Sequence, residues 1–282
     1  MKIHAYLLCH NEQYILSHIL EYYSSFCSRI FLMDNYSTDD SLKIASEFSK
    51  VKVIQWKCDS EKTRTKEHIK HKVYTYKDYS RKGGKYTEEV ADWIIGADMD
   101  EVIYHPNLLD LLKTFKSNNV TVPKVMGLNV VNSNLKKNTP LVEQCKMGFR
   151  SSHFDKRIIW DCEFDMEASD GMHSQGAGYS KMLKQPKYKT DDKILLALLH
   201  CKYLGNRWIE IAEKAIETRK HLWCFKDGEL FGTGVHYFNQ WADANGHLNL
   251  LRRGYCSNEE YYRDRITQIL DDDLNVLFDA FD

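Results

Sequence analysis

The stretch ADWIIGADMDE, residues 91–101, is an apolar run that ends in the carboxylates of Asp98, Asp100 and Glu101. Its bulky and β-branched centre, 93–95, predicts a buried strand. Three carboxylates crowded at the end of such a strand repel one another and lose hydration. A divalent cation relieves both costs, and Mg²⁺ or Mn²⁺ prefers oxygen ligands and often bridges carboxylates to phosphates. The stretch therefore predicts a metal and diphosphate site at the carboxyl edge of an α/β sheet. The alternative is an acidic turn, because a single D-x-D is common by chance.

The N-terminal pattern around this stretch alternates between strand and helix. Gly96 and Ala97 carry little or no side chain, which suits a place where another segment comes close. Asn11 is expected to cap the first helix. Short connections between alternating elements imply a parallel sheet with right-handed crossovers. The predicted class is α/β, a Rossmann-like and mostly parallel sheet flanked by helices, with strands at 3–9, 29–34 and 51–56 and helices at 12–26 and from 37 onward.

The later pattern is less regular. Residues 61–90 are charged and are predicted to be mostly helical, whereas 141–186 is irregular and rich in histidine, glycine and aromatic residues. Further strands are predicted at 120–125, 128–131 and 194–203, and helices at 108–115, at 207–222 and within the final 25 residues.

Bulk composition excludes several classes of protein. The 282 residues contain 39 Lys and Arg against 40 Asp and Glu, so no net charge attracts nucleic acid. Eight scattered cysteines without a C-x-x-C pair argue against a zinc ribbon and a redox dithiol. No apolar run approaches the roughly 18–20 residues of a membrane span, and the N-terminus lacks the pattern of a signal peptide. We expect an intracellular, cytoplasmic protein, with peripheral association at the inner face of a membrane as an open alternative.

Nucleotide-binding fingerprints are missing from the first half of the chain. Neither G-x-G-x-x-G nor G-x-x-x-x-G-K-[ST] occurs, so phosphates need another anchor. A metal ion held by Asp98 and Asp100 would supply one.

Three motifs together resemble a known family. LLCHNEQYILSHILEYY (7–23), IFLMDNYSTDDS (30–41) and ADWIIGADMDEVIYHP (91–106) resemble the family 2 glycosyltransferases of the GT-A fold, of the bacterial surface-polysaccharide type. The resemblance is good over 3–131 and weaker beyond. It implies a metal-dependent transferase that moves a sugar from a nucleoside diphosphate sugar, expected to be a UDP-sugar, to a glycan or lipid-linked acceptor with inversion. It also implies one GT-A-like domain, with a nucleotide-sugar half at 1–131, an acceptor and active-site half at 132–240 and a helical extension at 241–282.

The resemblance also implies roles for individual residues. Asn11, Glu12 and Asp34 would line the pocket for the base and ribose, and Asp98 would contact ribose or metal. Mn²⁺ or Mg²⁺ would be held by Asp98 and Asp100 and by a histidine, for which His173 and His200 are equal candidates. Tyr36 stands where the family usually has glycine. Three cations, Lys156, Arg157 and Lys202, are candidates for the diphosphate.

The catalytic base is harder to place, because no clear E-D pair occurs where many family members keep it. Asp155, Glu167 and Asp170 are candidates, and Asp170 is preferred because the neighbouring Gly171 and His173 suggest a tight turn. The plain alternative for each is a solvated loop carboxylate.

Two other functions compete with the transferase. A sugar nucleotidyltransferase usually has a glycine-rich phosphate loop after its first strand, and here that loop reads CHNEQ. A non-catalytic sugar-binding relative is the other rival, and the intact Asp98-Met99-Asp100 argues against it. The donor sugar, the acceptor, the linkage and the oligomeric state have no readable signal.

Overall fold

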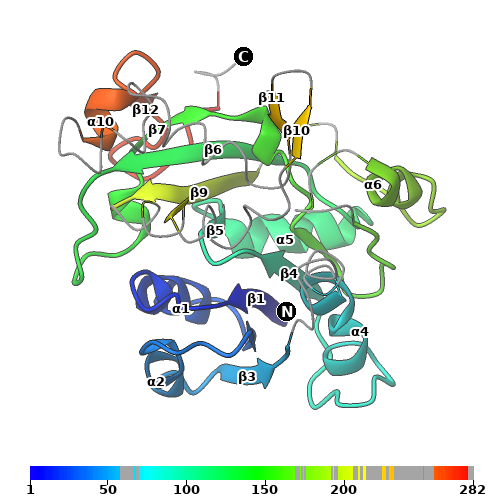
Figure 1. Ribbon diagram of the computed structural model, residues 1–282. Helices are drawn as coiled ribbons and strands as arrows, with labels where there is room; N and C mark the ends of the chain where they lie inside the picture. The colour runs from blue at the N-terminus through cyan, green and yellow to red at the C-terminus, as the bar shows by residue number, and fades with distance from the viewer. Residues whose placement is uncertain are drawn as a thin grey trace.

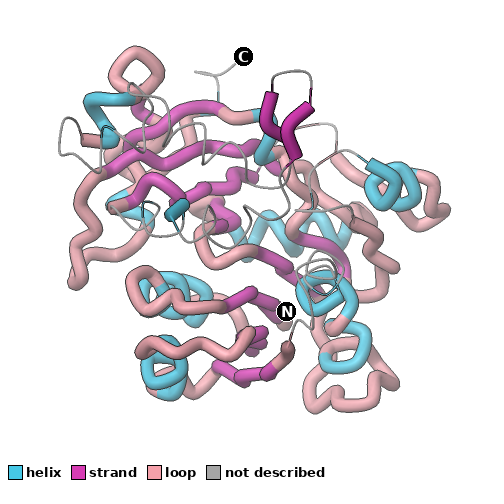
Figure 2. Tube along the Cα trace, in the orientation of Figure 1, coloured by secondary structure: helices cyan, strands magenta, loops and turns pink. Residues whose placement is uncertain are grey.

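The computed structural model describes residues 1–57, 67, 70–168, 172, 174, 176–191, 193, 196–205, 209, 212–213, 224–226, 229–231, 250 and 257–278. Two five-stranded sheets and a hairpin organise these residues (Figures 1 and 2). In the part of the chain that is described, no helix is both long and apolar enough to cross a bilayer.

The first sheet is the predicted parallel one. Its order is β3-β2-β1-β4-β8, and all neighbours are parallel except β8, which runs antiparallel to β4. Helices α1 and α2 lie on one side of it and α4 on the other (Figure 1). The strands are β1 (Ile3–Cys9), β2 (Arg29–Asp34), β3 (Val51–Gln55), β4 (Trp93–Ala97) and β8 (Ile159–Asp161), and the connecting helices are α1 (Leu16–Ser24) and α2 (Ser41–Ser46). The α/β class is thereby confirmed.

The order of the parallel strands reverses beside β1. The chain moves outward from β1 to β2 and β3, and then returns to place β4 on the other side of β1. Loops leaving the carboxyl ends of β1 and β4 therefore diverge, and open α/β sheets bind ligands in the crevice at such a point. This topology puts the loop after Cys9 and the acidic stretch after Ala97 at the same edge.

Helix starts differ from the sequence-based expectation. Helix α1 begins at Leu16, and Asn11, with a φ of 58°, does not cap it. The side-chain oxygen of Asn11 instead accepts from the backbone N of Thr38 at 2.7 Å. Ser37 likewise bonds the Asp34 carboxylate and leaves α2 to begin at Ser41. Both polar side chains join the two loops to each other, which competes with capping.

The second sheet is mixed. Its order is β12-β7-β6-β9-β5; β6 and β9 are parallel, and the other neighbours are antiparallel. One strand, β6, replaces the two predicted at 120–125 and 128–131, because the backbone N of Thr121 and Val122 bonds Lys189 instead of continuing the sheet. The strands are β5 (Glu101–Tyr104), β6 (Val125–Asn132), β7 (Met147–Arg150), β9 (Leu196–Leu204) and β12 (Thr267–Gln268).

Shorter elements fill the remaining described segments. Where 61–90 was expected to be mostly helical, the described part holds a π-helical turn, a short α-helix and turns. The predicted helix at 108–115 is present as α5 (Leu108–Ser117), whereas most of 207–222 lies outside the described residues. The others are η1 (Lys70–Tyr74), α4 (Tyr76–Tyr79), η2 (Val142–Gln144), η3 (Ser152–Phe154), α6 (Gly176–Leu183), β10 (Cys224–Lys226), β11 (Glu229–Phe231) and α10 (Asn258–Tyr261).

The helical extension expected at 241–282 is wrong for 257–278. This segment holds the short helix α10, strand β12 and an isolated bridge between Leu270 and Val276. Its apolar residues pack on the second sheet, where the rings of Tyr262 and Phe149 lie 5.0 Å apart. Tertiary pairing has overridden an apolar spacing that also suits a helix.

Candidate active site

Two loops meet beyond the carboxyl ends of β1 and β2, and they bring together the three residues expected to line the donor pocket. The buried Asp34 carboxylate accepts from the Ser37 hydroxyl at 2.6 Å and from Gln55 Nε2 at 3.0 Å. Asn11 bonds the second loop through Thr38, and the backbone N of Glu12 donates to Ser41 Oγ at 2.8 Å. Asp34 thus shapes the loops, and a contact between Asp34 and a nucleoside stays a prediction.

Tyr36 stands on the same loop in a left-handed conformation. Its φ is 52°, and its side chain is among the exposed aromatic ones, at 55%. A non-glycine residue at positive φ costs free energy and often marks a functional turn. The ring is available to cover a ligand at this edge.

The acidic stretch after β4 is neutralised by two buried lysines. Lys72 Nζ lies 2.7 Å from Asp98 Oδ1, and Lys156 is ion-paired with Glu101. Lys156 Nζ also lies 3.9 Å from the second oxygen of Asp98. Glu101 is 1% exposed and accepts from the backbone N of Asp98 at 3.1 Å, which fixes the turn between the carboxylates.

Gly96 explains how Lys72 comes so close to the acidic stretch. A Cβ atom at Gly96 would lie 2.7 Å from the Trp160 ring and 2.8 Å from the Lys72 carbonyl oxygen. Only glycine lets β8 and η1 approach β4 to this distance. The expected role of Gly96 as a close-approach position is confirmed.

His200 faces the remaining aspartate from the second sheet. Strand pairing places His200 opposite Glu101, and its Nε2 lies 3.7 Å from Asp100 Oδ2. Its Nδ1 lies 2.6 Å from Asn129 Oδ1, and Nδ1 is the donor in this contact because an amide oxygen only accepts; in the neutral ring, Nε2 would then keep the lone pair. The Phe154 ring stacks on the imidazole at 3.8 Å. This support fixes the orientation of the imidazole.

At this edge, the pKa values of Asp100 and Lys202 are both shifted toward the neutral form. Burial, followed by the negative charges of Glu101 and Asp98, raises the pKa of Asp100 from 3.8 to about 7. Burial also lowers the pKa of Lys202 to about 8, although Asp100 partly opposes this shift. An added cation stabilises a carboxylate whose charge is disfavoured, and an added anion stabilises a lysine whose charge is disfavoured.

The residues suit a hard divalent metal. A carboxylate of raised pKa and an oriented imidazole nitrogen are ligands that Mg²⁺ or Mn²⁺ accepts, and only Met99 separates Asp98 from Asp100 in the sequence. Within the described ranges, no three acidic, histidine or cysteine side chains gather closely enough to hold a metal ion by themselves.

The candidate bases are distributed differently. Asp155 accepts from Arg150 at 2.6 Å and from the backbone N of Gly127 at 2.9 Å, contacts typical of a structural carboxylate. Glu167 Oε2 accepts from the Tyr74 hydroxyl at 3.1 Å. The preferred base Asp170 and the alternative metal ligand His173 lie outside the described residues. The assignment of the base stays a prediction.

Lys72 is the site residue that sequence reasoning missed. It lies in the lysine-rich stretch 61–90, where nothing in the pattern separates it from a solvated lysine. Gly96 was the available signal, because a close-approach position at the end of an acidic strand implies a partner for that strand. Asn129 and Phe154, which orient His200, carried no signal of their own.

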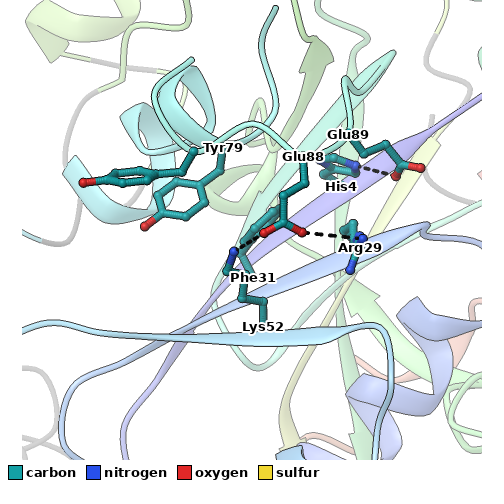
Figure 3. A pocket seen from close by; sticks show the side chains of 8 residues that line it. His4, Arg29, Phe31, Lys52, Tyr79, Glu88 and Glu89 are labelled. Atoms are coloured by element: carbon teal, nitrogen blue, oxygen red, sulfur yellow. Dashed lines mark hydrogen bonds and ion pairs between the residues drawn. The ribbon is translucent and has the colours of Figure 1, made fainter. Parts of the chain in front are cut away.

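A second cluster of charged residues lies toward the amino ends of the same strands, around a small hollow (Figure 3). His4 Nδ1 lies 2.5 Å from Ser80 Oγ, and His4 Nε2 lies 3.0 Å from Glu89 Oε1. Glu88 pairs with Lys52 at 2.7 Å and with Arg29 at 3.7 Å. These side chains neutralise one another, whereas at the carboxyl edge Asp100 keeps a raised pKa beside the paired lysines.

Comparisons with known proteins give structural neighbours only. No model of a known protein family matches the sequence, and no curated protein matches it. The chain is similar to S. aureus TarS 1–349 in complex with UDP-GlcNAc, with a TM-score of 0.41 and 13% identity over 93% of this chain and 79% of that one. It is also similar to glucosyl-3-phosphoglycerate synthase from Mycobacterium tuberculosis in complex with Mn²⁺, UDP and glucosyl-3-phosphoglycerate, with a TM-score of 0.29 and 15% identity over 45% of this chain and 44% of that one.

Proposed function

We propose that this chain is a metal-dependent glycosyltransferase that uses a nucleoside diphosphate sugar, with UDP as the expected nucleotide. The observation that carries the proposal is the approach of His200 Nε2 to Asp100 Oδ2 at 3.7 Å, in the stretch that also contains Asp98, at the crevice where the strand order reverses. Open α/β sheets bind nucleotides at this place. Nearby lysines and a carboxylate of raised pKa favour a ligand that brings both negative phosphate and a cation.

Each part of the edge has a role in holding the donor. The loops that contain Asn11, Glu12 and Asp34 would hold the base and ribose. Lys72 and Lys156 place positive charge where a diphosphate would lie, beside Asp98. Asp98, Asp100 and His200 would hold Mn²⁺ or Mg²⁺, which neutralises charge on a leaving diphosphate.

The reaction is a single displacement at the anomeric carbon. The acceptor hydroxyl oxygen forms the new bond as the bond to the diphosphate oxygen breaks, and that electron pair leaves with the diphosphate. The hydroxyl proton passes to a carboxylate base, for which Asp170 is preferred and Glu167 and Asp155 are alternatives. One base on the face opposite the leaving group gives inversion. The acceptor is proposed to be a glycan or a lipid-linked saccharide.

Nucleotide binding tests the donor site directly. Thermal unfolding of the full chain is measured with UDP, GDP, CDP and ADP, each with Mn²⁺ or with EDTA. A ligand that binds only the native state raises the melting temperature by mass action. We expect a shift with UDP that requires Mn²⁺ and is lost in Asp100→Asn, whereas Asp110→Asn, a change of an exposed carboxylate on α5, retains the shift.

Activity gives the second readout. Asp100→Asn is expected to lower the rate of sugar transfer by roughly 10²–10³-fold, the range seen when one preorganised electrostatic group is removed. Release of UDP from UDP-sugars with a panel of acceptors measures it. If no nucleotide shifts the melting temperature of the wild-type chain, the donor site is wrong, and a non-catalytic role replaces the transferase.

A further inference from the structure

We propose that Arg157 binds a phosphate group of a substrate and so extends the candidate active site along the segment that leads into β8. Arg157 is 8% exposed, and its Nε has no hydrogen-bond partner. It also forms no ion pair with any residue in the described part of the chain. A buried polar nitrogen without a partner is uncommon, because its lost hydration is not replaced by a hydrogen bond.

Neighbouring buried cations show that this chain normally pairs such groups. Lys156, the adjacent residue, is 3% exposed and is paired with Glu101. Lys72 is 4% exposed and lies 2.7 Å from Asp98 Oδ1. Arg157 is the exception among these three, so its partner is absent from the described protein side chains and is expected to arrive with a ligand.

The position of Arg157 in the chain brings it next to the candidate active site. The backbone N of Gly96 donates to the carbonyl of Ile158, the next residue, at 2.8 Å. Arg157 therefore stands beside the carboxyl end of β4, where the acidic stretch begins. Lys156, the residue before Arg157, has its Nζ 3.9 Å from Asp98 Oδ2.

The chemistry of the guanidinium selects the class of ligand. Its planar fork donates two parallel hydrogen bonds to a phosphate or carboxylate, and it keeps its charge at any ordinary pH. At a site proposed for a nucleoside diphosphate sugar, phosphate is the matching oxyanion. The identification of this phosphate as the donor diphosphate rests on the proposed function. The proposal that Arg157 binds a phosphate group does not.

Three variants separate binding from packing. Arg157→Met removes the charge, Arg157→Lys keeps the charge without the fork, and Arg81→Met is the matched control. Arg81 is a partly buried arginine that donates to Asp165 at 2.7 Å and to the carbonyl of Phe164 at 2.9 Å. Melting temperatures of the full chain are measured alone and with UDP and Mn²⁺, with uridine, and with inorganic phosphate.

The expected pattern is opposite for the two arginines. Arg157→Met should keep or raise the melting temperature without ligand and weaken UDP binding about 10- to 100-fold, while uridine binding stays unchanged. Arg157→Lys should recover part of the affinity. Arg81→Met should lower the melting temperature and leave UDP binding intact.

Other outcomes locate the phosphate or overturn the proposal. If UDP binding is unchanged but a stabilising effect of inorganic phosphate is lost in Arg157→Met, the anion belongs to the acceptor. Loss of the phosphate effect in Arg157→Met would support the proposal even if the chain does not bind a nucleoside diphosphate. If Arg157→Met lowers the melting temperature like Arg81→Met and changes neither ligand effect, Arg157 is structural and the proposal is overturned.

Discussion

The two ends of the first sheet carry similar side chains in opposite states. Toward the amino ends, His4 has partners on both ring nitrogens and Glu88 pairs with two cations. At the carboxyl ends, Asp100 has a raised pKa and Arg157 Nε has no partner. Charged residues therefore occur at both ends, and only the quality of their pairing distinguishes a stabilising cluster from a candidate site.

The contrast also explains how one chain tolerates the site. The free energy that burial of Asp100 and of Arg157 Nε costs at the carboxyl edge is offset by hydrogen-bonded networks and by the buried core elsewhere. Substitutions at the amino end should therefore lower stability without a direct effect on ligand binding. Substitutions of Asp100 or Arg157 at the carboxyl end should weaken ligand binding without lowering stability.

Lys156→Met should have the largest effect on stability, because Lys156 lies at the carboxyl edge and is nevertheless paired with a buried carboxylate. The change leaves Glu101 buried without its cation. We expect the free energy of unfolding to fall by about 3–5 kcal/mol, as when one partner of a buried pair is removed. Urea unfolding measures it.

The double variant Lys156→Met, Glu101→Gln is the control for that prediction. It removes both charges and should recover most of the lost stability. A single variant as stable as wild type would show that Glu101 does not depend on Lys156.

His4→Leu sharpens the comparison at the amino end. The change removes one of the partners of Ser80 and one of the partners of Glu89, and we expect a loss of about 1–3 kcal/mol in the free energy of unfolding. His18→Leu is the matched control, since His18 is also buried but its Nδ1 has no hydrogen-bond partner. That substitution should cost little. Equal losses in the two variants would show that the network around His4 adds nothing beyond packing.

The pH dependence of stability is the smallest expected effect. Burial lowers the pKa of His4 below 6.5, and hydrogen bonds from Lys2, Ser28 and His4 outweigh burial to lower the pKa of Glu89 from 4.5 to about 2. Both groups bind fewer protons in the folded state than in the unfolded one, so stability rises with pH.

Thermal unfolding between pH 7 and pH 3 measures this dependence. The contribution of His4 should be complete above its ordinary pKa of 6.5 and decline below it, and that of Glu89 should decline below 4.5. Glu89→Gln should flatten the lower part of the profile. An unchanged profile in Glu89→Gln would assign the acid sensitivity to other groups.

Local patterns in the sequence predicted the first sheet. Strands β1, β2 and β4 are apolar runs with helices between them, and their pairing follows from chain order and crossover handedness. The second sheet pairs segments as distant as Gly148 and Thr267, and nothing local in either segment names its partner. The same lack of local information made the C-terminal segment resemble a helix.

The candidate site divides in the same way. Asp98 and Asp100 lie in one motif and are predicted by it, whereas the resemblance offers His200 only as one of two equal candidates, beside His173. Lys72 was missed, since its role depends on the packing of η1 against Gly96. Sequence located Arg157 among three cations but could not show that it alone is buried without a partner for its Nε.

The acidic stretch is also the joint between the two sheets. Strand β4 ends at Ala97 in the first sheet and β5 begins at Glu101 in the second, so residues 98–100 are the whole covalent connection there. A ligand that binds Asp98 and Asp100 would contact the segment that connects the two sheets, and it would therefore constrain both sheets at once. An insertion or deletion within these residues would rotate or shift one half against the other, so chemistry and architecture would fail together.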